Sequence, residues 1–217
     1  MKIGIYGGTF DPPHIGHINA CKAFVENVEL DVLYVIPVFM PPHKEKISST
    51  DTNSRFEMSK IAFSDLSSKI VVSDIEIKRE GKSYTADTIR YFKENYQNPE
   101  IYFLCGTDMI LTMDFWYKPE YIFKNATIVY VRRESEAENS KKIAEKCAYY
   151  KEKFDAKIIY LDIKALDISS TEIREAIKEK NKLKELVTDE IYEYIVKNRL
   201  YLDMEIWITI GNILNLQ

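Results

Sequence analysis

The sequence predicts an α/β protein built on one doubly wound, Rossmann-like parallel sheet, with helices on both faces and further helices near the C-terminus. Two observations support this prediction. Short apolar runs alternate along the chain with segments of helical period, and this order implies right-handed crossovers between parallel strands. No stretch rich in proline, glycine or serine divides the chain, so we expect residues 1–201 to form a single domain.

Each element follows from its local pattern. An apolar run before a Gly-Gly pair is typical of a buried strand, and apolar residues at helical spacing mark the helices. The expected extended segments are Lys2–Tyr6, Val32–Val38, Lys69–Ile77, Ile101–Cys105, Ala126–Arg132 and Lys157–Leu161, with a charged turn at Arg79–Lys82. The expected helices are Ile15–Val28, Asn53–Phe63, one marked by Ile89, Phe92 and Tyr96, one marked by Ile143, Cys147, Tyr150 and Phe154, Thr171–Lys180 and Asp189–Asn198.

The composition excludes several classes of protein. The chain has 217 residues, with 30 lysines and arginines against 34 aspartates and glutamates, a formal net charge of −4. This balance gives no general attraction to nucleic acid or anionic lipid, and no apolar stretch reaches the ~20 residues that span a bilayer. The three cysteines are widely spaced, as is typical of reduced thiols. We therefore expect a cytoplasmic protein that binds neither nucleic acid nor membrane.

Residues 202–217 are expected to form a C-terminal tail outside this domain. Their apolar residues fit one face of a helix and equally fit the alternation of a strand, so the pattern leaves the structure open. Three interpretations remain: the tail packs on its own domain, it is buried in a second subunit of a homo-oligomer, or it is an artefact at the end of the gene.

The loop after the first strand has the composition of a phosphate site. Residues 7–17 read GGTFDPPHIGH, and the glycine pair allows the backbone to approach a ligand closely. Asp11 is expected to cap the next helix, with Pro12 in its first turn. The N–H groups and positive dipole of a helix N-terminus favour a phosphate. His14 and His17 lie three residues apart, so they share one helix face near that end.

A second phosphate-compatible segment lies late in the chain, where residues 168–174 read ISSTEIR. Ser169 and Glu172 fit a capping box, which accounts for both residues. A capping box does not account for Arg174, because the helix dipole mildly disfavours a cation soon after a helix start. A bound polyphosphate would make use of the arginine, the hydroxyls and the N–H groups together.

These residues carry a resemblance to a known family. GGTFDPPHIGH and ISSTEIR resemble the nucleotidylyltransferase superfamily with its H-x-G-H signature. Within it, the sequence is similar to the bacterial nicotinate-nucleotide adenylyltransferases through PPHK at 41–44, Arg55 with Met58, SYTADT at 83–88, GTD at 106–108 and Trp116. The motifs lie in the expected order from residue 3 to about residue 201, so the resemblance covers most of the chain.

The resemblance implies a reaction in NAD biosynthesis, in which ATP and nicotinate mononucleotide give nicotinate adenine dinucleotide and pyrophosphate. The 5′-phosphate of the mononucleotide would attack the α-phosphorus of ATP in line, without a covalent enzyme intermediate. Catalysis would then consist of positioning and charge neutralisation. Mg²⁺ would be carried by the ATP phosphates, and no protein metal ligand is expected.

The resemblance also assigns roles to residues. His14, His17 and Arg174 are expected to be catalytic, and His17 is the first choice for stabilising the transition state. The residues expected to bind ATP are Gly8, Thr9, Phe10, His14, His17, Gly106, Asp108, Ile168, Ser169, Ser170 and Arg174. The residues expected to bind the mononucleotide are Lys44, Arg55, Tyr84, Thr85 and Trp116, with Trp116 stacked on the pyridine ring and Thr85 facing the nicotinate carboxylate.

Other functions are compatible with parts of the pattern. Pantetheine-phosphate adenylyltransferases share the first motif, but they are shorter and lack the SYT and tryptophan set. An enzyme that prefers nicotinamide mononucleotide differs only in a few contacts to the substituent on the ring. His14, His17 and His43 could instead be zinc ligands of a hydrolase, and a nucleotide-sensing module without activity would share the fold.

Overall fold

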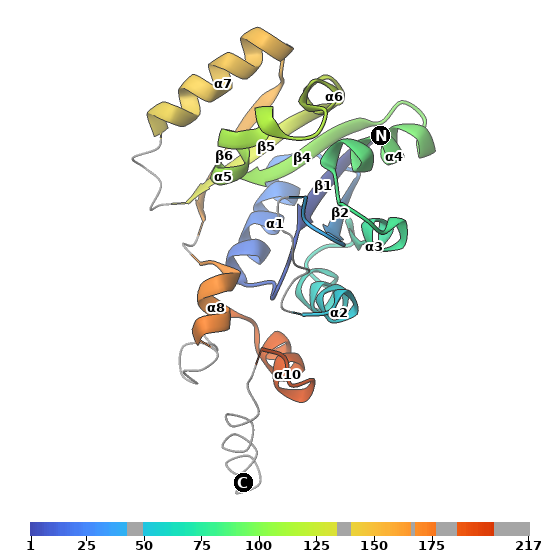
Figure 1. The fold of residues 1–217 in the computed structure, drawn as a ribbon, viewed down its shortest axis with the longest axis vertical. Coiled ribbons are helices and arrows are strands. Elements are labelled where there is room, and N and C mark those ends of the chain that lie inside the picture. The colour runs from blue at the N-terminus through green and yellow to red at the C-terminus, as the bar shows by residue number, and fades with distance from the viewer. Residues whose placement is uncertain (43–49, 134–139, 166–167, 177–185, 202–217) are drawn as a thin grey trace, which may run out of the picture.

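A computed structural model describes residues 1–42, 50–133, 140–165, 168–176 and 186–201. Parallel strands form one sheet of six in the order β3-β2-β1-β4-β5-β6 (Figure 1). The strands are β1 (Lys2–Gly8), β2 (Val32–Pro37), β3 (Ile70–Val72), β4 (Glu100–Gly106), β5 (Ala126–Arg133) and β6 (Ile158–Ala165). This order confirms the predicted doubly wound sheet, because the chain builds outward from β1 first in one direction and then in the other.

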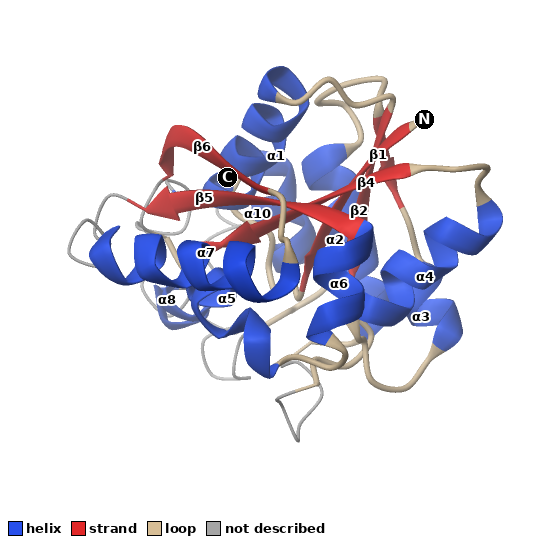
Figure 2. Cartoon of the chain, turned by 90° about the horizontal axis from the view of Figure 1, so that it is seen from above, coloured by secondary structure: helices blue, strands red, loops and turns tan. Residues whose placement is uncertain are grey.

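Helices cover both faces of the sheet (Figure 2). The helices on one face are α1 (Ile15–Asn27), α2 (Thr52–Phe63), α8 (Ser170–Ala176) and α10 (Asp189–Lys197). The helices on the other face are α4 (Thr85–Asn95), α5 (Thr107–Thr112), α6 (Pro119–Asn125) and α7 (Ser140–Phe154). A short helix, α3 (Ile75–Arg79), follows β3, and a 3₁₀ turn, η1 (Met113–Phe115), follows α5.

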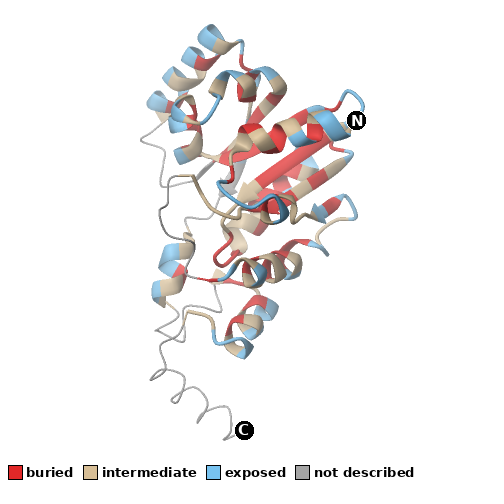
Figure 3. Ribbon diagram, turned by 45° about the vertical axis from the view of Figure 1, so that its right-hand side comes forward, coloured by how far each residue is buried: buried red, intermediate tan, exposed pale blue. Residues whose placement is uncertain are grey.

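Two apolar cores hold these layers together, one on each face of the sheet. Phe24 of α1 and Leu104 of β4 are fully buried in the first core, and Phe92 of α4 and Ile128 of β5 are buried in the second. In Figure 3 the sheet is largely buried and the outer faces of the helices are exposed. Because each buried apolar side chain contributes about 1.5–3 kcal/mol, these two cores supply the framework on which the loops are held.

The structure corrects two details of the sequence prediction. The segment Lys69–Ile77 is extended only over β3, because α3 already begins at Ile75. Arg79 therefore ends a helix rather than opening a turn, and the chain reverses at Gly81, whose φ of +70° favours glycine. Helices α5 and α6 were not expected from the pattern, since each is too short for a helical period to show clearly.

The architecture places the carboxyl ends of β1, β2 and β4 side by side. Tyr6 of β1 pairs in register with Leu104 of β4, and Gly8 pairs with Pro37 of β2. Ligands of open α/β sheets bind at such a point, where the strand order reverses. Across the described segments, no helix combines the length and apolar character needed to cross a membrane. The predicted tail at 202–217 lies outside the described residues.

Candidate active site

The two histidines of the first motif form the cap of helix α1. His14 is the N-cap residue, and its Nδ1 accepts a hydrogen bond from the backbone N–H of His17 at 3.4 Å. In return, Nδ1 of His17 accepts from the backbone N–H of His14 at 3.3 Å, and the two rings stack with centroids 3.6 Å apart. The expected cap, Asp11, is therefore wrong: the helix begins at Ile15, and the capping box is made by the histidines themselves.

This reciprocal cap determines which ring nitrogen carries hydrogen. A neutral imidazole has one N–H donor and one acceptor nitrogen, and Nδ1 is the acceptor in both rings. Nε2 of His14 and of His17 therefore carries the hydrogen and serves as a donor. A protonated Nε2 has no lone pair for a metal ion, so this arrangement disfavours the zinc-hydrolase alternative. The third proposed ligand, His43, lies outside the described residues.

The late motif packs directly on the histidine loop. Ser170 donates from its hydroxyl to the carbonyl of Pro12 at 2.9 Å, and Arg174 donates to the carbonyl of Asp11 at 2.7 Å. Tyr201 adds a hydrogen bond of 2.6 Å from its hydroxyl to the Asp11 carboxylate. These contacts join segments that are more than 150 residues apart, so Ser170 and Arg174 hold the loop in shape; contact of either residue with ATP stays a prediction.

One hollow lies against the N-terminus of α1, and we call it the histidine compartment. Its walls include His14, Gly16, His17, Gly106, Asp108 and Ile168, and its volume is about 160 Å³. The missing side chain of Gly7 leaves open space there, whereas a Cβ on Gly8 would lie 2.7 Å from the Phe10 ring. The Phe10 ring is itself buried, and it packs edge to face against Tyr6 and His17 in the wall of this compartment.

A second hollow adjoins the first, and we call it the aromatic compartment. Its volume is about 560 Å³, and its walls include Tyr84, Thr85, Trp116 and Tyr117. The Trp116 ring meets Phe103 edge to face at 6.2 Å, and Tyr84 packs on Tyr117 at 4.5 Å. Gly7, Gly8 and Met109 line both hollows. Thr9, which the resemblance assigns to ATP binding, lies in the wall of this second compartment and not among the residues that line the histidine compartment.

Arg55 lies beneath the site rather than in it. The side chain is 0% exposed, and its guanidinium donates to the carbonyl of Thr9 at 2.8 Å and to that of Phe39 at 3.3 Å. Burial lowers the pKa of Arg55, and the nearby Asp11 carboxylate opposes this shift. The expectation that Arg55 contacts the mononucleotide does not fit this geometry, because the side chain is fully buried and both of its terminal nitrogens donate to backbone carbonyls.

Three further residues expected in the site, Ser169, Asp108 and Lys44, differ in where they lie. Ser169 forms the predicted capping box, since its hydroxyl and backbone N–H both donate to Glu172. Asp108 is exposed in the first turn of α5 and lines the histidine compartment. Lys44 lies outside the described residues. The sequence motifs do not point to the wall residues Glu76, Met109 and Phe115, because isolated residues on unpredicted short helices carry no pattern.

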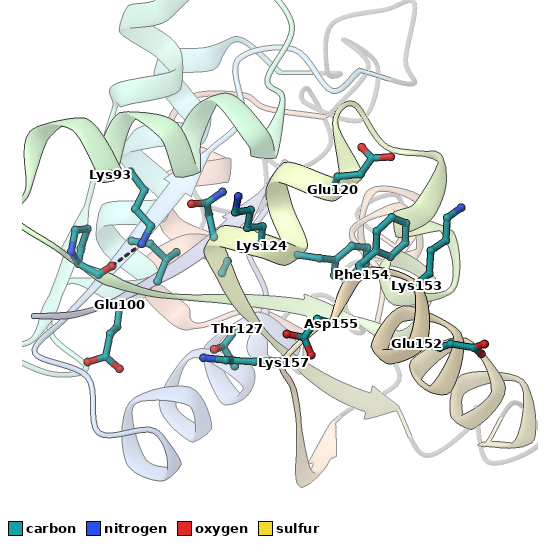
Figure 4. Close-up of a pocket in the computed structure, with 15 residues that line it drawn as sticks. Lys93, Glu100, Glu120, Lys124, Thr127, Glu152, Lys153, Phe154, Asp155 and Lys157 are labelled. Atoms are coloured by element: carbon teal, nitrogen blue, oxygen red, sulfur yellow. Dashed lines mark hydrogen bonds between the residues drawn. The ribbon is translucent and has the colours of Figure 1, made fainter.

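A larger hollow, of about 740 Å³, lies at the other end of the strands, where β4 and β5 begin (Figure 4). It is lined by the amino ends of β4 and β5 and by side chains of both charges, among them Glu100, Lys124 and Asp155. Lys93 donates to the carbonyl of Pro99 at 2.8 Å at its rim. Although this hollow is larger, we do not regard it as the candidate active site. In this class of fold, ligands bind beyond the carboxyl ends of the strands, where the histidine and aromatic compartments lie.

Comparison with known proteins shows the family to which the chain belongs. A family model described as cytidylyltransferase-like matches residues 5–176. A protein of Clostridium tetani named "Probable nicotinate-nucleotide adenylyltransferase" is 38% identical over 200 residues, which are 92% of this chain and 98% of the relative. A protein of Caldicellulosiruptor saccharolyticus with the same name is 35% identical over 201 residues, 93% of this chain and 99% of the relative.

Solved structures of similar fold also include nicotinic acid mononucleotide adenylyltransferases. The nicotinic acid mononucleotide adenylyltransferase of Plasmodium falciparum in complex with NaAD has a TM-score of 0.77 at 25% identity, over 92% of this chain and 97% of that one. The same protein in complex with APC has a TM-score of 0.75 at 25% identity, over 92% and 96% of the two chains.

Proposed function

Because the chain belongs to the cytidylyltransferase-like family, and within it to the nicotinate-nucleotide adenylyltransferases, we propose that it transfers the adenylyl group of ATP to nicotinate mononucleotide in NAD biosynthesis. The feature that supports this most is the histidine cap of α1, which lines a hollow that shares Gly7, Gly8 and Met109 with the aromatic compartment. The first hollow suits the phosphates of ATP, and the second suits a pyridine ring.

The reaction is a single displacement at phosphorus. An oxygen of the mononucleotide 5′-phosphate forms a bond to the α-phosphorus of ATP as the bond to the β-phosphate oxygen breaks. The products are nicotinate adenine dinucleotide and pyrophosphate, so nothing is oxidised or reduced. The protein supplies position and donors rather than a nucleophile.

The histidines suit the charge that develops during this transfer. Their Nε2–H groups are donors, and the first turn of a helix has N–H groups without intrahelical acceptors, of which that of His17 is capped by His14. The backbone at Gly16 lacks a Cβ, so a phosphate can lie close to the helix. Donors held in advance of the reaction lower the barrier because they need no rearrangement as charge forms on the pyrophosphate oxygens. We assign His17 and His14 to this role and Asp108 to the ribose of ATP.

The aromatic compartment would hold the mononucleotide. Trp116 offers its indole face to the pyridine ring, and the N-terminus of α4 places Thr85 at the same wall. Backbone N–H groups and a hydroxyl at a helix N-terminus favour the carboxylate of nicotinate over a neutral amide. We assign Lys44 to the mononucleotide phosphate, whose negative charge its ammonium group would neutralise.

Mg²⁺ would enter with ATP as part of the substrate. The histidine compartment offers N–H donors and one exposed carboxylate, Asp108, a donor set that fits phosphate oxygens rather than an ion enclosed by protein. When bound, the ion would neutralise phosphate charge and orient the leaving pyrophosphate. We also propose a cytoplasmic location, since free thiols such as Cys21, Cys105 and Cys147 are typical of a reducing compartment.

The proposal is tested by steady-state assays with ATP, Mg²⁺ and either nicotinate or nicotinamide mononucleotide, with the dinucleotide product identified by chromatography. We expect turnover of both, with the acid favoured by roughly tenfold or more in kcat/KM near neutral pH, because donors facing an amide nitrogen would stay unpaired. Equal values or preference for the amide would contradict the assignment to nicotinate. Absence of turnover with either would contradict the adenylyltransferase itself and leave the nucleotide-sensing alternative.

The direct displacement has its own test, in the stereochemistry at phosphorus. ATP carrying one sulfur on the α-phosphorus is chiral there, and a single in-line attack inverts that centre. We expect a dinucleotide of inverted configuration. Retention would require two successive displacements, and therefore a covalent adenylyl-enzyme intermediate.

A further inference from the structure

One ion pair anchors the turn that carries Trp116 into the wall of the aromatic compartment. Asp114 lies in η1, two residues before Trp116, and Lys146 lies on α7, which packs on α5. The ammonium group of Lys146 donates to both oxygens of the Asp114 carboxylate, at 2.8 and 2.9 Å. The Asp114 side chain is only 12% exposed, so water screens this pair less than it screens a pair at the open surface.

The ion pair lies behind the aromatic compartment. Asp114 and Lys146 line a different hollow, of about 480 Å³, together with Tyr149. Any effect of the pair on a molecule in the aromatic compartment must therefore pass through the residues that follow Asp114 in the chain.

Tyr150 ties the same turn to α7 a second time. Its side chain is fully buried, and its hydroxyl shares one hydrogen between the carbonyl of Ile110 at 2.7 Å and Oδ1 of Asp114 at 2.9 Å. The same hydroxyl oxygen accepts from the backbone N–H of Asp114 at 3.4 Å. Ile110 lies near the end of α5, where a helix leaves carbonyls without an intrahelical partner. The end of α5 and the start of η1 are therefore both held by α7.

The surroundings of Asp114 keep its carboxyl group ionised. Burial alone would raise the pKa of Asp114, but the hydrogen bonds from Lys146 and Tyr150 outweigh burial and hold that pKa below its usual value. Burial also raises the pKa of the Tyr150 phenol, so this neighbour stays neutral and keeps its hydrogen. Removal of Lys146 would leave a half-buried carboxylate without its cation, which favours a shift of the turn toward water.

The aromatic wall begins directly after this anchor. The next three residues, Phe115, Trp116 and Tyr117, all line the aromatic compartment. The backbone N–H of Trp116 donates to a carbonyl of η1 at 3.2 Å, and the ammonium group of Lys146 lies 5.3 Å from the centre of the Phe115 ring. Phe115 is 78% exposed, so its own packing does little to fix the segment. This part of the wall takes its position from η1, and η1 takes its position from α7.

We propose that Asp114, held by Lys146, is a positioning residue that sets the Trp116 ring where it stacks on the pyridine ring of the mononucleotide. This inference rests on the proposed function, in which Trp116 receives that ring. Small displacements of a positioning group weaken recognition even when the reacting groups are unchanged. Loss of the anchor should therefore impair binding of the mononucleotide and spare both ATP and the transfer step, because the histidine loop is held by Ser170 and Arg174.

The variant Lys146→Met tests this role, since it keeps much of the side-chain length and removes the ammonium group. We expect KM for nicotinate mononucleotide to rise about two- to twelve-fold, which is what stacking geometry contributes, with KM for ATP and kcat changed by less than about twofold. Lys60→Met is the matched control. Lys60 also pairs with a carboxylate, that of Glu57 at 2.6 Å, and lies 5.1 Å from the centre of an aromatic ring, that of Phe56, but on α2. It should leave both KM values unchanged.

A conservative variant separates the ion pair from a general loss of packing. Lys146→Arg retains a cation that can donate to both oxygens of Asp114, so we expect KM for the mononucleotide to return most of the way to that of the unaltered protein. A folded Lys146→Met protein whose KM for the mononucleotide is unchanged, or whose two KM values rise equally, would overturn the positioning role. If Lys146→Met does not fold, Asp114→Asn takes its place under the same criteria, because the amide oxygen still accepts from Tyr150 while the charge is lost.

The fluorescence of Trp116 gives a readout that needs no turnover. In a Trp207→Phe background the signal comes from Trp116 alone, and acrylamide quenching reports how open the indole is to solvent. We expect Lys146→Met to shift the emission to longer wavelength and to raise the quenching constant, and Lys60→Met to change neither. Identical emission and quenching in all three proteins would overturn the positioning role. Failure of the proposed function would show separately, as absence of turnover in the unaltered protein.

Discussion

The histidine and aromatic compartments lie side by side but are built on different principles. In the first, the polar groups are already engaged with the protein: His14 and His17 cap one helix together, and Ser170 and Arg174 hold the loop that carries them. In the second, apolar side chains and five aromatic rings line the wall, those of Tyr84, Phe103, Phe115, Trp116 and Tyr117.

This difference indicates a division of labour. Charge that appears only in the transition state is best met by donors that are fixed beforehand, and the histidine compartment has this character. A substrate is best distinguished from its analogue by a group that is satisfied by only one of them, and the aromatic compartment has that character. Changes in the first should therefore lower kcat, and changes in the second should alter KM or the choice of substrate.

The largest effect is expected for His17→Gln. Glutamine at the third position of a helix can still accept from the N-cap N–H, so the capping box is retained while the imidazole is lost. We expect kcat to fall by about 10²–10³-fold with the melting temperature nearly unchanged. Stopped-time assays of dinucleotide formation and thermal denaturation of the same preparation check both parts.

The matching change at the other histidine serves as the control for the cap. His14→Asn preserves an N-cap acceptor for the His17 N–H and should be folded, with a loss of kcat that shows whether both rings contribute. A His17→Gln protein with activity within a few-fold of the original would refute the role of the imidazole in the transfer.

A smaller effect, on stability, is expected for Tyr201→Phe. The Tyr201 hydroxyl donates to the Asp11 carboxylate at 2.6 Å, and a hydrogen bond to a charged group is worth about 1.5–3 kcal/mol. We expect the free energy of unfolding to fall by about that amount, measured by urea denaturation.

Tyr160→Phe is the control for this prediction, since it removes a hydroxyl that donates to Asp162 at 3.0 Å in an exposed setting. That bond should contribute only about 0–1 kcal/mol. Equal losses in the two variants would show that the Tyr201 contact has no special part in holding the loop.

The smallest effect is expected for Trp116→Ala, and it should be confined to one substrate. Stacking on an indole contributes roughly 0.5–1.5 kcal/mol beyond burial, so KM for nicotinate mononucleotide should rise several-fold while KM for ATP stays the same. In a Trp207→Phe background, quenching of the Trp116 fluorescence by the mononucleotide reports the stacking directly. A variant that loses stability but keeps both KM values would mean that Trp116 serves only the apolar core.

The same contrast explains how much could be predicted from the sequence. The sheet and the histidine loop are encoded by local patterns, namely apolar runs, a glycine pair and two histidines at helical spacing. The use of His14 as the cap instead of Asp11 depends on where the helix starts, which the pattern leaves uncertain by a few residues.

The aromatic compartment could be predicted only in part. Trp116 and Thr85 were expected at the pyridine from the family resemblance, and both line the hollow. Glu76 was not expected, because it lies on a five-residue helix within a segment that looked extended. Arg55 was expected in the site and lies below it, since a sequence shows that an arginine is present but not whether it is buried.

The division between the compartments is tested most directly by a double-mutant cycle on kcat/KM, with His17→Gln, Trp116→Ala and the two combined. The His17 ring contacts Phe10 and the Trp116 ring contacts Phe103, and changes at independent sites usually add within about 0.3–0.5 kcal/mol. We predict that the double variant loses the product of the two single losses, within about a factor of two. A double variant no worse than His17→Gln alone would contradict this division, because transfer and recognition would then depend on one coupled site.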